Sequence, residues 1–159
     1  MWVPFDQLPS TARLWIFTSP SPLDTANIQP PLQEFVRTWT AHRQDLLASA
    51  WVYDDYFILL AVDEAQTSAS GCSIDKATRF VQDLGQSLNL NFLEKRRYFY
   101  RNGDEPIQAV DHPTMQAAVQ DSTVTENTLV ADTLLTQVGD LHRLWLPFGQ
   151  SWHRRLFGR

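Results

Sequence analysis

The chain has 159 residues and a net charge of −5; 43% of its residues are hydrophobic and 19% are charged. This length and composition suit a single globular domain with a sizeable core and exclude a disordered chain. The negative charge argues against general binding to DNA or RNA, because such binding depends on Lys and Arg at phosphates. We therefore expect no nucleic-acid partner.

The cysteine content predicts a reducing compartment. Cys72 is the only cysteine, so the chain has no internal disulfide. The first residues lack the basic segment and the apolar run of a signal peptide, and no apolar run approaches the length of a membrane span. These features predict a cytoplasmic protein without a membrane span. The histidines show no metal-ligand spacing, so we expect no metal and no cofactor.

The first predicted elements are an extended segment, a strand and a helix. Residues 1–11 contain two prolines and should pack on the domain without forming a helix. Leu14–Thr18 is β-prone and apolar at successive positions, which predicts a strand covered on both faces. Helical spacing of apolar residues then predicts a helix that starts at Pro31 and ends between His42 and Gln44.

A hairpin, a second helix and an edge strand follow. Leu47–Tyr53 and Tyr56–Val62 are β-prone runs joined by a tight turn at Asp54-Asp55. The second run is apolar on both faces, which is typical of a central strand. Ile74–Leu88 has the spacing of an amphipathic helix, although a glycine near its end weakens it. Lys95–Arg101 alternates charged and aromatic residues, as an edge strand does.

This order predicts an α+β fold with a ferredoxin-like βαββαβ centre over residues 12–104, an antiparallel sheet with two helices on one face. The first and third strands belong in the middle of such a sheet, and they are the two that are apolar on both faces. Residues 105–159 should form a C-terminal α/β extension that packs on the centre within one domain. A helix start at Asp111 and a short strand at Thr128–Ala131 lie in this extension. The same elements in another α+β strand order are the alternative.

Several stretches resemble a family of short bacterial proteins that carry the name "ABC transporter ATPase". They are Met1–Phe5, Ala61–Glu64, Ser70–Asp75, Thr128–Asp132 and Ser151-Trp152. The resemblance spans most of the chain. It implies no catalytic residues, because the family has no established activity.

The residues of this chain do not support the activity in that name. An ABC ATPase needs a glycine-rich loop that ends in Gly-Lys-Ser/Thr, so that backbone N–H groups surround the phosphates and the lysine reaches the terminal ones. None of the six glycines is followed by lysine. We therefore expect no ATP hydrolysis.

The main candidate site is the polar segment Ser70–Asp75, at the start of the second helix. Ser70, Gly71 and Ser73 could form an anion pocket with the free N–H groups of the helix start. Asp75 suits the helix dipole and would disfavour a second anion at the same place. In the structural alternative, Ser73 is simply the N-cap of the helix.

A thiol site is the second candidate. Cys72 lies at a helix start, which favours the thiolate, and three nearby carboxylates act in the opposite direction. In the predicted topology, the end of the first helix brings His42 to the same end of the sheet as Cys72. His42 could then act as the base for a Cys72 nucleophile. The alternative is that Cys72 is a small buried residue that packs the loop.

Because no complete catalytic set is present, we expect a non-catalytic module that binds a small molecule or a protein at Ser70–Asp75. A small thiol-dependent enzyme that uses Cys72 with His42 is the alternative. Trp145 and Trp152 in the tail could anchor a partner or a homodimer, since aromatic residues dominate binding hot spots.

Overall fold

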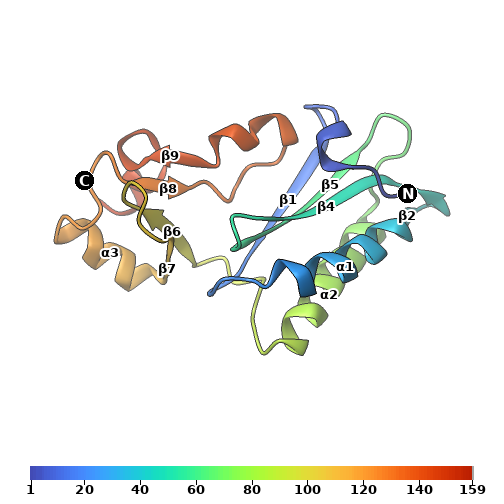
Figure 1. Cartoon of the computed structure of the whole chain (residues 1–159). Helices are drawn as coiled ribbons and strands as arrows, with labels where there is room; N and C mark the ends of the chain where they lie inside the picture. Colours follow the sequence, from blue (N-terminus) through green and yellow to red (C-terminus); the bar gives the residue numbers. More distant parts are fainter. Residues whose placement is uncertain (159) are drawn as a thin grey trace. The chain divides into compact units, whose positions relative to one another are not determined.

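The computed structural model describes residues 1–158, whose helices and strands are labelled in Figure 1. The chain divides into two compact units. Unit 1 contains residues 1–93 and 135–141, and unit 2 contains the rest of the described chain from residue 94. Both units combine helices with an antiparallel sheet, so the α+β class is confirmed.

The sheet of unit 1 has three antiparallel strands in the order β1 (Arg13–Thr18), β5 (Phe57–Asp63) and β4 (Leu47–Tyr53). In the central strand, residues 57–62 are all fully buried. Burial on both faces is the reason for the continuous apolar run in this strand. The predicted β1 and the predicted hairpin are both confirmed.

The hairpin turn between β4 and β5 is a two-residue turn. Asp54 and Asp55 have φ angles of 50° and 61°. Positive φ at both central residues gives a turn whose twist matches that of the flanking strands. Aspartate tolerates this region of backbone space better than most residues do, which explains why a turn without glycine forms here.

Two helices, α1 (Thr25–Arg37) and α2 (Gly71–Ser87), lie on the same face of this sheet (Figure 1). The bounds predicted for the first helix are wrong at both ends. α1 starts six residues before the predicted start at Pro31, because the Asp24 side chain caps it by accepting a hydrogen bond from the Ala26 N–H (3.2 Å). Pro30 and Pro31 therefore lie inside the helix.

The helix also ends earlier than predicted, because residues 40–45 form a small hairpin of their own. Its strands are β2 (Thr40–Ala41) and β3 (Gln44–Asp45). The turn between them contains His42 and Arg43, whose φ angles of 51° and 64° are incompatible with a continuing helix. His42 therefore lies in an exposed turn and not at a helix end.

The ferredoxin-like strand order is not confirmed. β1 lies beside β5, and β5 lies beside β4, as that order requires. The predicted fourth strand, Lys95–Arg101, does not join β1. Instead, β6 (Tyr98–Arg101) pairs with other strands in the sheet of unit 2. The outer edge of β1 is bonded at Leu14, whose N–H donates to the Thr136 carbonyl oxygen (2.9 Å).

The burial of β6 explains the difference. Tyr98 and Phe99 are consecutive and both buried, so both faces of the strand are covered. An edge strand predicted from alternating charges would leave one face in solvent. The charged part of the predicted strand, residues 95–97, lies outside β6 and carries the chain into the second unit.

Unit 2 is built on a four-stranded antiparallel sheet in the order β7-β6-β8-β9. Its remaining elements are β7 (Gln108–Val110), α3 (His112–Gln120), β8 (Leu129–Ala131), η2 (Val138–Arg143), which starts in unit 1, β9 (Trp145–Pro147), η3 (Phe148–Gln150) and α4 (His153–Leu156). The predicted helix start is confirmed, because the Asp111 side chain accepts from the Thr114 N–H (2.9 Å). The short strand predicted at Thr128–Ala131 is confirmed as β8.

The N-terminal segment pairs with the outer edge of β4. Trp2 forms a parallel bridge with Ala48, in which the Val3 N–H donates to the Ala48 carbonyl oxygen (2.9 Å). A short 3-10 turn, η1 (Phe5–Gln7), follows and contacts β4. Covering part of a strand edge in this way protects it from pairing with another chain.

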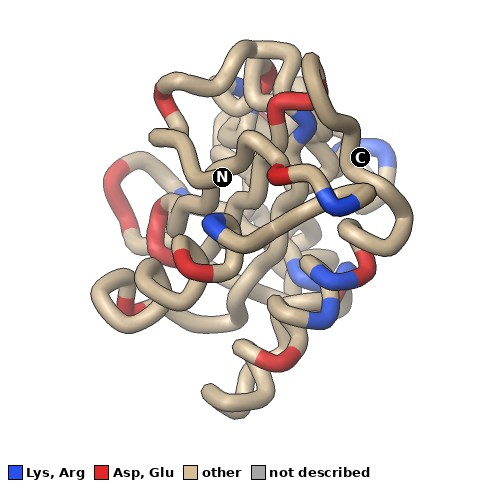
Figure 2. Tube along the Cα trace, turned by 90° about the vertical axis from the view of Figure 1, so that its right-hand side faces the viewer, with Lys and Arg blue, Asp and Glu red and all other residues tan. Residues whose placement is uncertain are grey.

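Charged residues are distributed in both units. Figure 2 shows basic and acidic positions interspersed along the trace, without a long run of one sign. Among the helices of residues 1–158, none is long and apolar enough to cross a membrane.

Candidate functional site

The predicted site, Ser70–Asp75, is the capped start of α2. Ser70 is the N-cap, and its Oγ accepts from the Ser73 N–H (3.1 Å). Ser73 Oγ donates to the Ser70 carbonyl oxygen (2.7 Å), and Ser73 itself is buried. Both hydroxyls are therefore used within the cap. The alternative that made Ser73 the cap is wrong by three residues.

Cys72 and Gly71 are exposed in the first turn of α2, and Asp75 is exposed in the next. The interpretation of Cys72 as a small buried packing residue is therefore wrong. Among residues 1–158, the thiol forms no hydrogen bond or ion pair. Its exposure makes it accessible to reagents, and exposure alone does not make a thiol catalytic.

The turn that carries His42 lies near the start of α2. The Trp39 indole N–H donates to the Ser73 carbonyl oxygen (2.8 Å), and β2 contacts α2. The structure therefore brings the two segments to the same end of the sheet. Among the described residues, no hydrogen bond joins His42 to Cys72.

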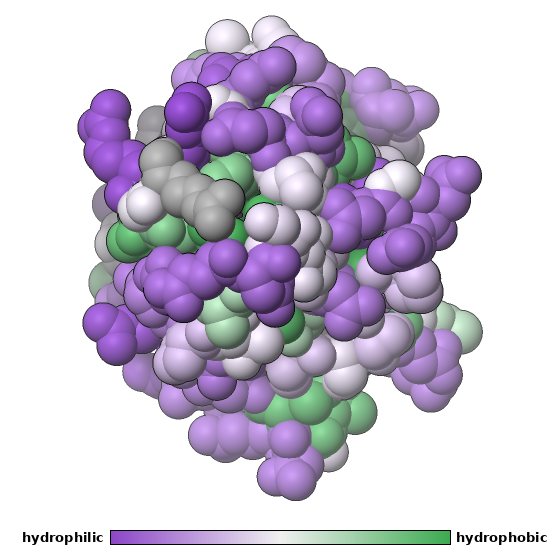
Figure 3. All heavy atoms as spheres, turned by 90° about the vertical axis from the view of Figure 1, so that its left-hand side faces the viewer, coloured by the Kyte–Doolittle hydropathy of each residue, from purple (hydrophilic) through white to green (hydrophobic). Residues whose placement is uncertain are grey.

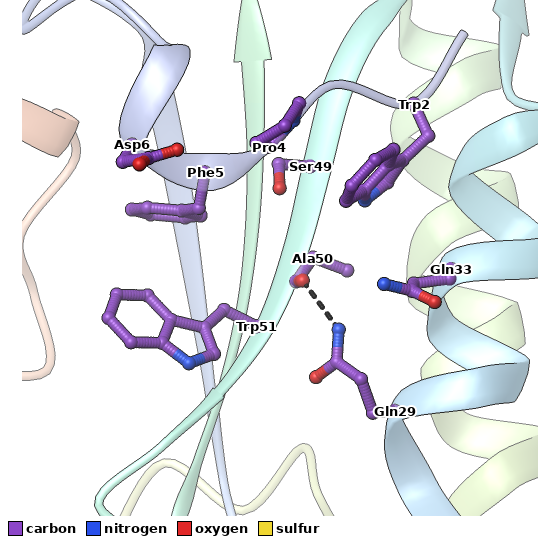
Figure 4. A pocket seen from close by; sticks show the side chains of 9 residues that line it. All are labelled: Trp2, Pro4, Phe5, Asp6, Gln29, Gln33, Ser49, Ala50 and Trp51. Atoms are coloured by element: carbon purple, nitrogen blue, oxygen red, sulfur yellow. Dashed lines mark hydrogen bonds between the residues drawn. The ribbon is translucent and has the colours of Figure 1, made fainter.

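A second place in unit 1 has the form of a binding site. A groove of about 420 Å³ lies between the N-terminal segment, α1 and the outer edge of β4, and we call it the β4 groove. Its lining residues are Trp2, Pro4, Phe5, Asp6, Gln29, Gln33, Ser49, Ala50 and Trp51. Figure 4 shows Phe5 over Trp51 on one side, with Trp2 and Gln33 on the other.

Three aromatic side chains form much of its wall. The Phe5 and Trp51 rings lie 5.2 Å apart between centroids, so each holds the other in place. Trp51 is 40% exposed and Trp2 is 37% exposed. Large apolar side chains that are half in solvent at the edge of a hollow are typical of ligand sites.

One amide in the groove completes the strand edge. The Gln29 side chain donates from Nε2 to the Ala50 carbonyl oxygen (2.9 Å), drawn as a dashed line in Figure 4, and its Oε1 accepts from the Val52 N–H (3.2 Å). These are the bonds that a neighbouring parallel strand would make with β4. The side chain therefore protects the edge beyond the point where the N-terminal segment leaves it.

Three other polar groups of the groove have no partner among residues 1–158. Ser49 is 1% exposed, and its Oγ forms no hydrogen bond within this part of the chain. The Gln33 amide, which points toward Trp2 in Figure 4, forms none with residues 1–158. Asp6 forms no ion pair with any of residues 1–158. A buried hydroxyl without a partner costs free energy, which a ligand at this place would offset.

The sequence contained only weak signals for this groove. Gln29 and Gln33 are four residues apart and share one helix face, and Ser49 interrupts an otherwise apolar strand. Nothing in the sequence links them to Trp2 and Phe5, because the N-terminal segment reaches them only through tertiary pairing with β4.

In unit 2, a serine is paired with a buried histidine. Ser151 Oγ and His153 Nδ1 lie 2.6 Å apart, and His153 is 1% exposed. Burial lowers the pKa of His153 from 6.5 to about 4, and the charge of Asp132 acts weakly in the other direction. A neutral imidazole that is 1% exposed inside a packed core indicates a structural role for His153.

The tail tryptophans are occupied within the chain. Trp152 stacks on His153, with ring centroids 3.7 Å apart, and donates from its indole N–H to Asp132 (3.0 Å). The Arg101 guanidinium covers Trp145 at 4.6 Å. On the face shown in Figure 3, apolar residues form small separate areas among polar ones. Both side chains are half-buried, so their role as anchors for a partner or a homodimer stays a prediction.

A basic hollow of about 520 Å³ next to this tail is lined by Gln150, Ser151 and Arg155, among others. The other arginine of its lining, Arg154, lies 3.6 Å from Glu126. Among residues 1–158, no cluster of His, Cys, Asp and Glu could hold a metal ion. Comparisons with protein-family models, curated proteins and solved structures found no match to this chain.

Proposed function

We propose that this protein is a non-catalytic binding module whose ligand occupies the β4 groove. The observation that carries the proposal is the buried, unpartnered Ser49 hydroxyl at a hollow of about 420 Å³ with aromatic walls. Volumes of this size are typical of small-molecule sites, as is a mostly apolar lining with a few polar groups. The groove supports binding better than Ser70–Asp75 does, because the hydroxyls of that segment are used in the cap.

A ligand screen by NMR tests this function. We expect small molecules that bind to shift the indole N–H signals of Trp2 and Trp51 and the side-chain amide signals of Gln29 and Gln33. Trp51→Ala should weaken binding about tenfold, since the ring is a half-exposed wall of the groove. Leu134→Ala, which removes an exposed apolar side chain elsewhere, is the control and should leave binding unchanged.

Two outcomes would contradict the proposal. In the first, no compound of any charge shifts the groove signals. In the second, compounds shift the backbone signals of Ser70–Asp75 instead, which would return the site to the start of α2. A free N–H at a helix start is the feature that would hold an anion there.

The thiol-enzyme alternative depends on the exposed Cys72 and on the nearness of the His42 turn. We expect iodoacetamide to modify Cys72 in the folded protein at the rate of a small free thiol near neutral pH, with no change when His42 is replaced. Mass spectrometry over a time course measures this rate. A much faster reaction that slows in His42→Asn would favour an activated nucleophile and so the enzyme.

A further inference from the structure

The lining of the β4 groove carries a negative charge and no positive one. Asp6 is the only ionisable side chain in the lining, and no lysine or arginine belongs to it. The α-amino group of Met1 is not part of the lining and donates to the Leu46 carbonyl oxygen (2.7 Å). The chain as a whole carries a net charge of −5. An anionic ligand would therefore meet repulsion here, and a cationic one attraction.

The aromatic rings of the groove have no cation of their own. In other parts of the chain, arginines cover half-exposed tryptophans: Arg13 lies over Trp15 at 4.7 Å, and Arg101 lies over Trp145 at 4.6 Å. Among residues 1–158, no cation covers Trp2 or Trp51. Indole faces attract cations through the ring quadrupole. Trp2 is 37% exposed, and Trp51 is 40% exposed although its ring also contacts Phe5 and Tyr53.

The polar groups of the groove provide acceptors. Ser49 Oγ, the Gln33 amide oxygen and the Asp6 carboxylate can all accept hydrogen bonds, and none has a described partner. A primary ammonium group has three N–H donors and no acceptor. A ligand with such a head and a short apolar body matches both the acceptors and the aromatic walls.

We propose that the β4 groove binds a small organic cation, a primary alkylammonium compound. The inference rests on the proposed binding function and deepens it by naming the ligand class. Asp6 supplies the opposite charge, the Trp2 and Trp51 faces hold the cation and its alkyl body, and Ser49 accepts a hydrogen bond. Charge complementarity selects this occupant over a neutral or anionic one.

Titration of the full chain with three matched probes tests the proposal. The probes are n-pentylamine, n-pentanol and n-pentanoate, which share an alkyl body and differ in charge. Binding is followed through the indole signals of Trp2 and Trp51 at low ionic strength. We expect n-pentylamine to bind at least about fivefold more tightly than either of the others, and its affinity to fall with added salt.

Asp6→Asn keeps the shape of the side chain and removes its charge. This variant should lose about threefold to tenfold in affinity for n-pentylamine and nothing for n-pentanol. Asp83→Asn, at an exposed position on α2, is the control and should change neither affinity. Trp51→Leu retains an apolar wall without a π face, and should weaken n-pentylamine more than n-pentanol.

The results distinguish the two proposals. Equal binding of the three probes at the groove signals would overturn the cation proposal and leave the binding function standing. No response to these probes or to the wider screen would overturn both. A short lysine-containing peptide that binds more tightly than n-pentylamine would also overturn the small-molecule proposal, because the groove would then be a peptide-docking surface.

Discussion

Acidification from about pH 7.5 to about pH 4.5 is expected to lower the free energy of unfolding by about 2–3 kcal/mol through His153 alone. Its imidazole is 1% exposed and stacked on Trp152, so burial lowers its pKa from 6.5 to about 4. In the unfolded chain the group takes up a proton near pH 6.5. Between pH 6.5 and about 4, the unfolded state therefore binds more protons, and stability falls as the pH falls.

The pH dependence of stability caused by His153 falls in a higher pH range than that caused by the carboxylates. Hydrogen bonds from Thr114 and Thr123 hold the pKa values of Asp111 and Asp121 below their usual 3.8, so those groups lose their contribution at lower pH. Urea unfolding at several pH values above about 4 therefore reports mainly on His153.

The variant His153→Asn isolates the effect. Asparagine keeps a polar atom near the position of Nδ1 for Ser151 and does not titrate. The variant should be less stable than the natural chain at neutral pH, because the smaller side chain leaves a cavity. Acidification from about pH 7.5 to about pH 4.5 should then lower its free energy of unfolding by about 2–3 kcal/mol less than it does in the natural chain. His42→Asn, in an exposed turn that suits asparagine, is the matched control. Parallel pH curves for the natural chain and His153→Asn would contradict the assignment.

Gly85→Ala is expected to destabilise the protein by about 1–3 kcal/mol, although alanine is the better helix former by about 1 kcal/mol. A Cβ at this position would lie 2.7 Å from the Leu90 carbonyl oxygen and 3.2 Å from a ring carbon of Phe92. The nearer atom belongs to the backbone, and Phe92 is buried in the core of unit 1. Neither can move without disturbing the end of α2.

The geometry of the helix end explains why the approach is so close. The Leu90 N–H donates to the Gly85 carbonyl oxygen (2.8 Å), and the Asn89 N–H donates to the Gln86 carbonyl oxygen (3.1 Å). Asn89 has a φ of 57°, which completes a Schellman motif. The chain folds back directly over Gly85, where any side chain would meet it.

Gly71→Ala is the matched control in the same helix. No atom lies within 4 Å of a Cβ built at Gly71, and the position is exposed. Its unfolding free energy should stay within about 0.5 kcal/mol of the natural value. Urea unfolding of both variants at neutral pH measures the difference. A Gly85→Ala variant as stable as Gly71→Ala would show that Leu90 and Phe92 relax freely.

The hydrophobic pattern of the sequence correctly predicted the strands whose side chains are buried on both faces. The strand Leu14–Thr18 and the central strand over residues 57–62 were evident because apolar side chains at successive positions require cover on both faces. The helix at His112 was evident for a different reason. Its cap is a local hydrogen bond that the Thr114 N–H donates to the Asp111 side chain, three residues away.

The errors occurred where a local preference competed with tertiary contacts. Prolines 30 and 31 indicated a helix start, and the Asp24 cap placed that start earlier. Lys95–Arg101 has the alternating pattern of an edge strand, but Tyr98 and Phe99, which point to opposite faces of β6, are both buried. A helix cap and an anion site use the same residue types, so Ser70–Asp75 fits both interpretations. In the structure the cap uses the hydroxyls of Ser70 and Ser73.

The sequence by itself determined the α+β class, the hairpin with its Asp54-Asp55 turn, and the capped start of α3, because these depend on side-chain periodicity and on hydrogen bonds between near neighbours. Only the tertiary structure decided which sheet received β6 and how the N-terminal segment paired with β4. The β4 groove follows from that pairing. Its lining brings together Trp2, Gln33 and Trp51, which are far apart in the chain, and no local pattern encodes which distant segments will meet.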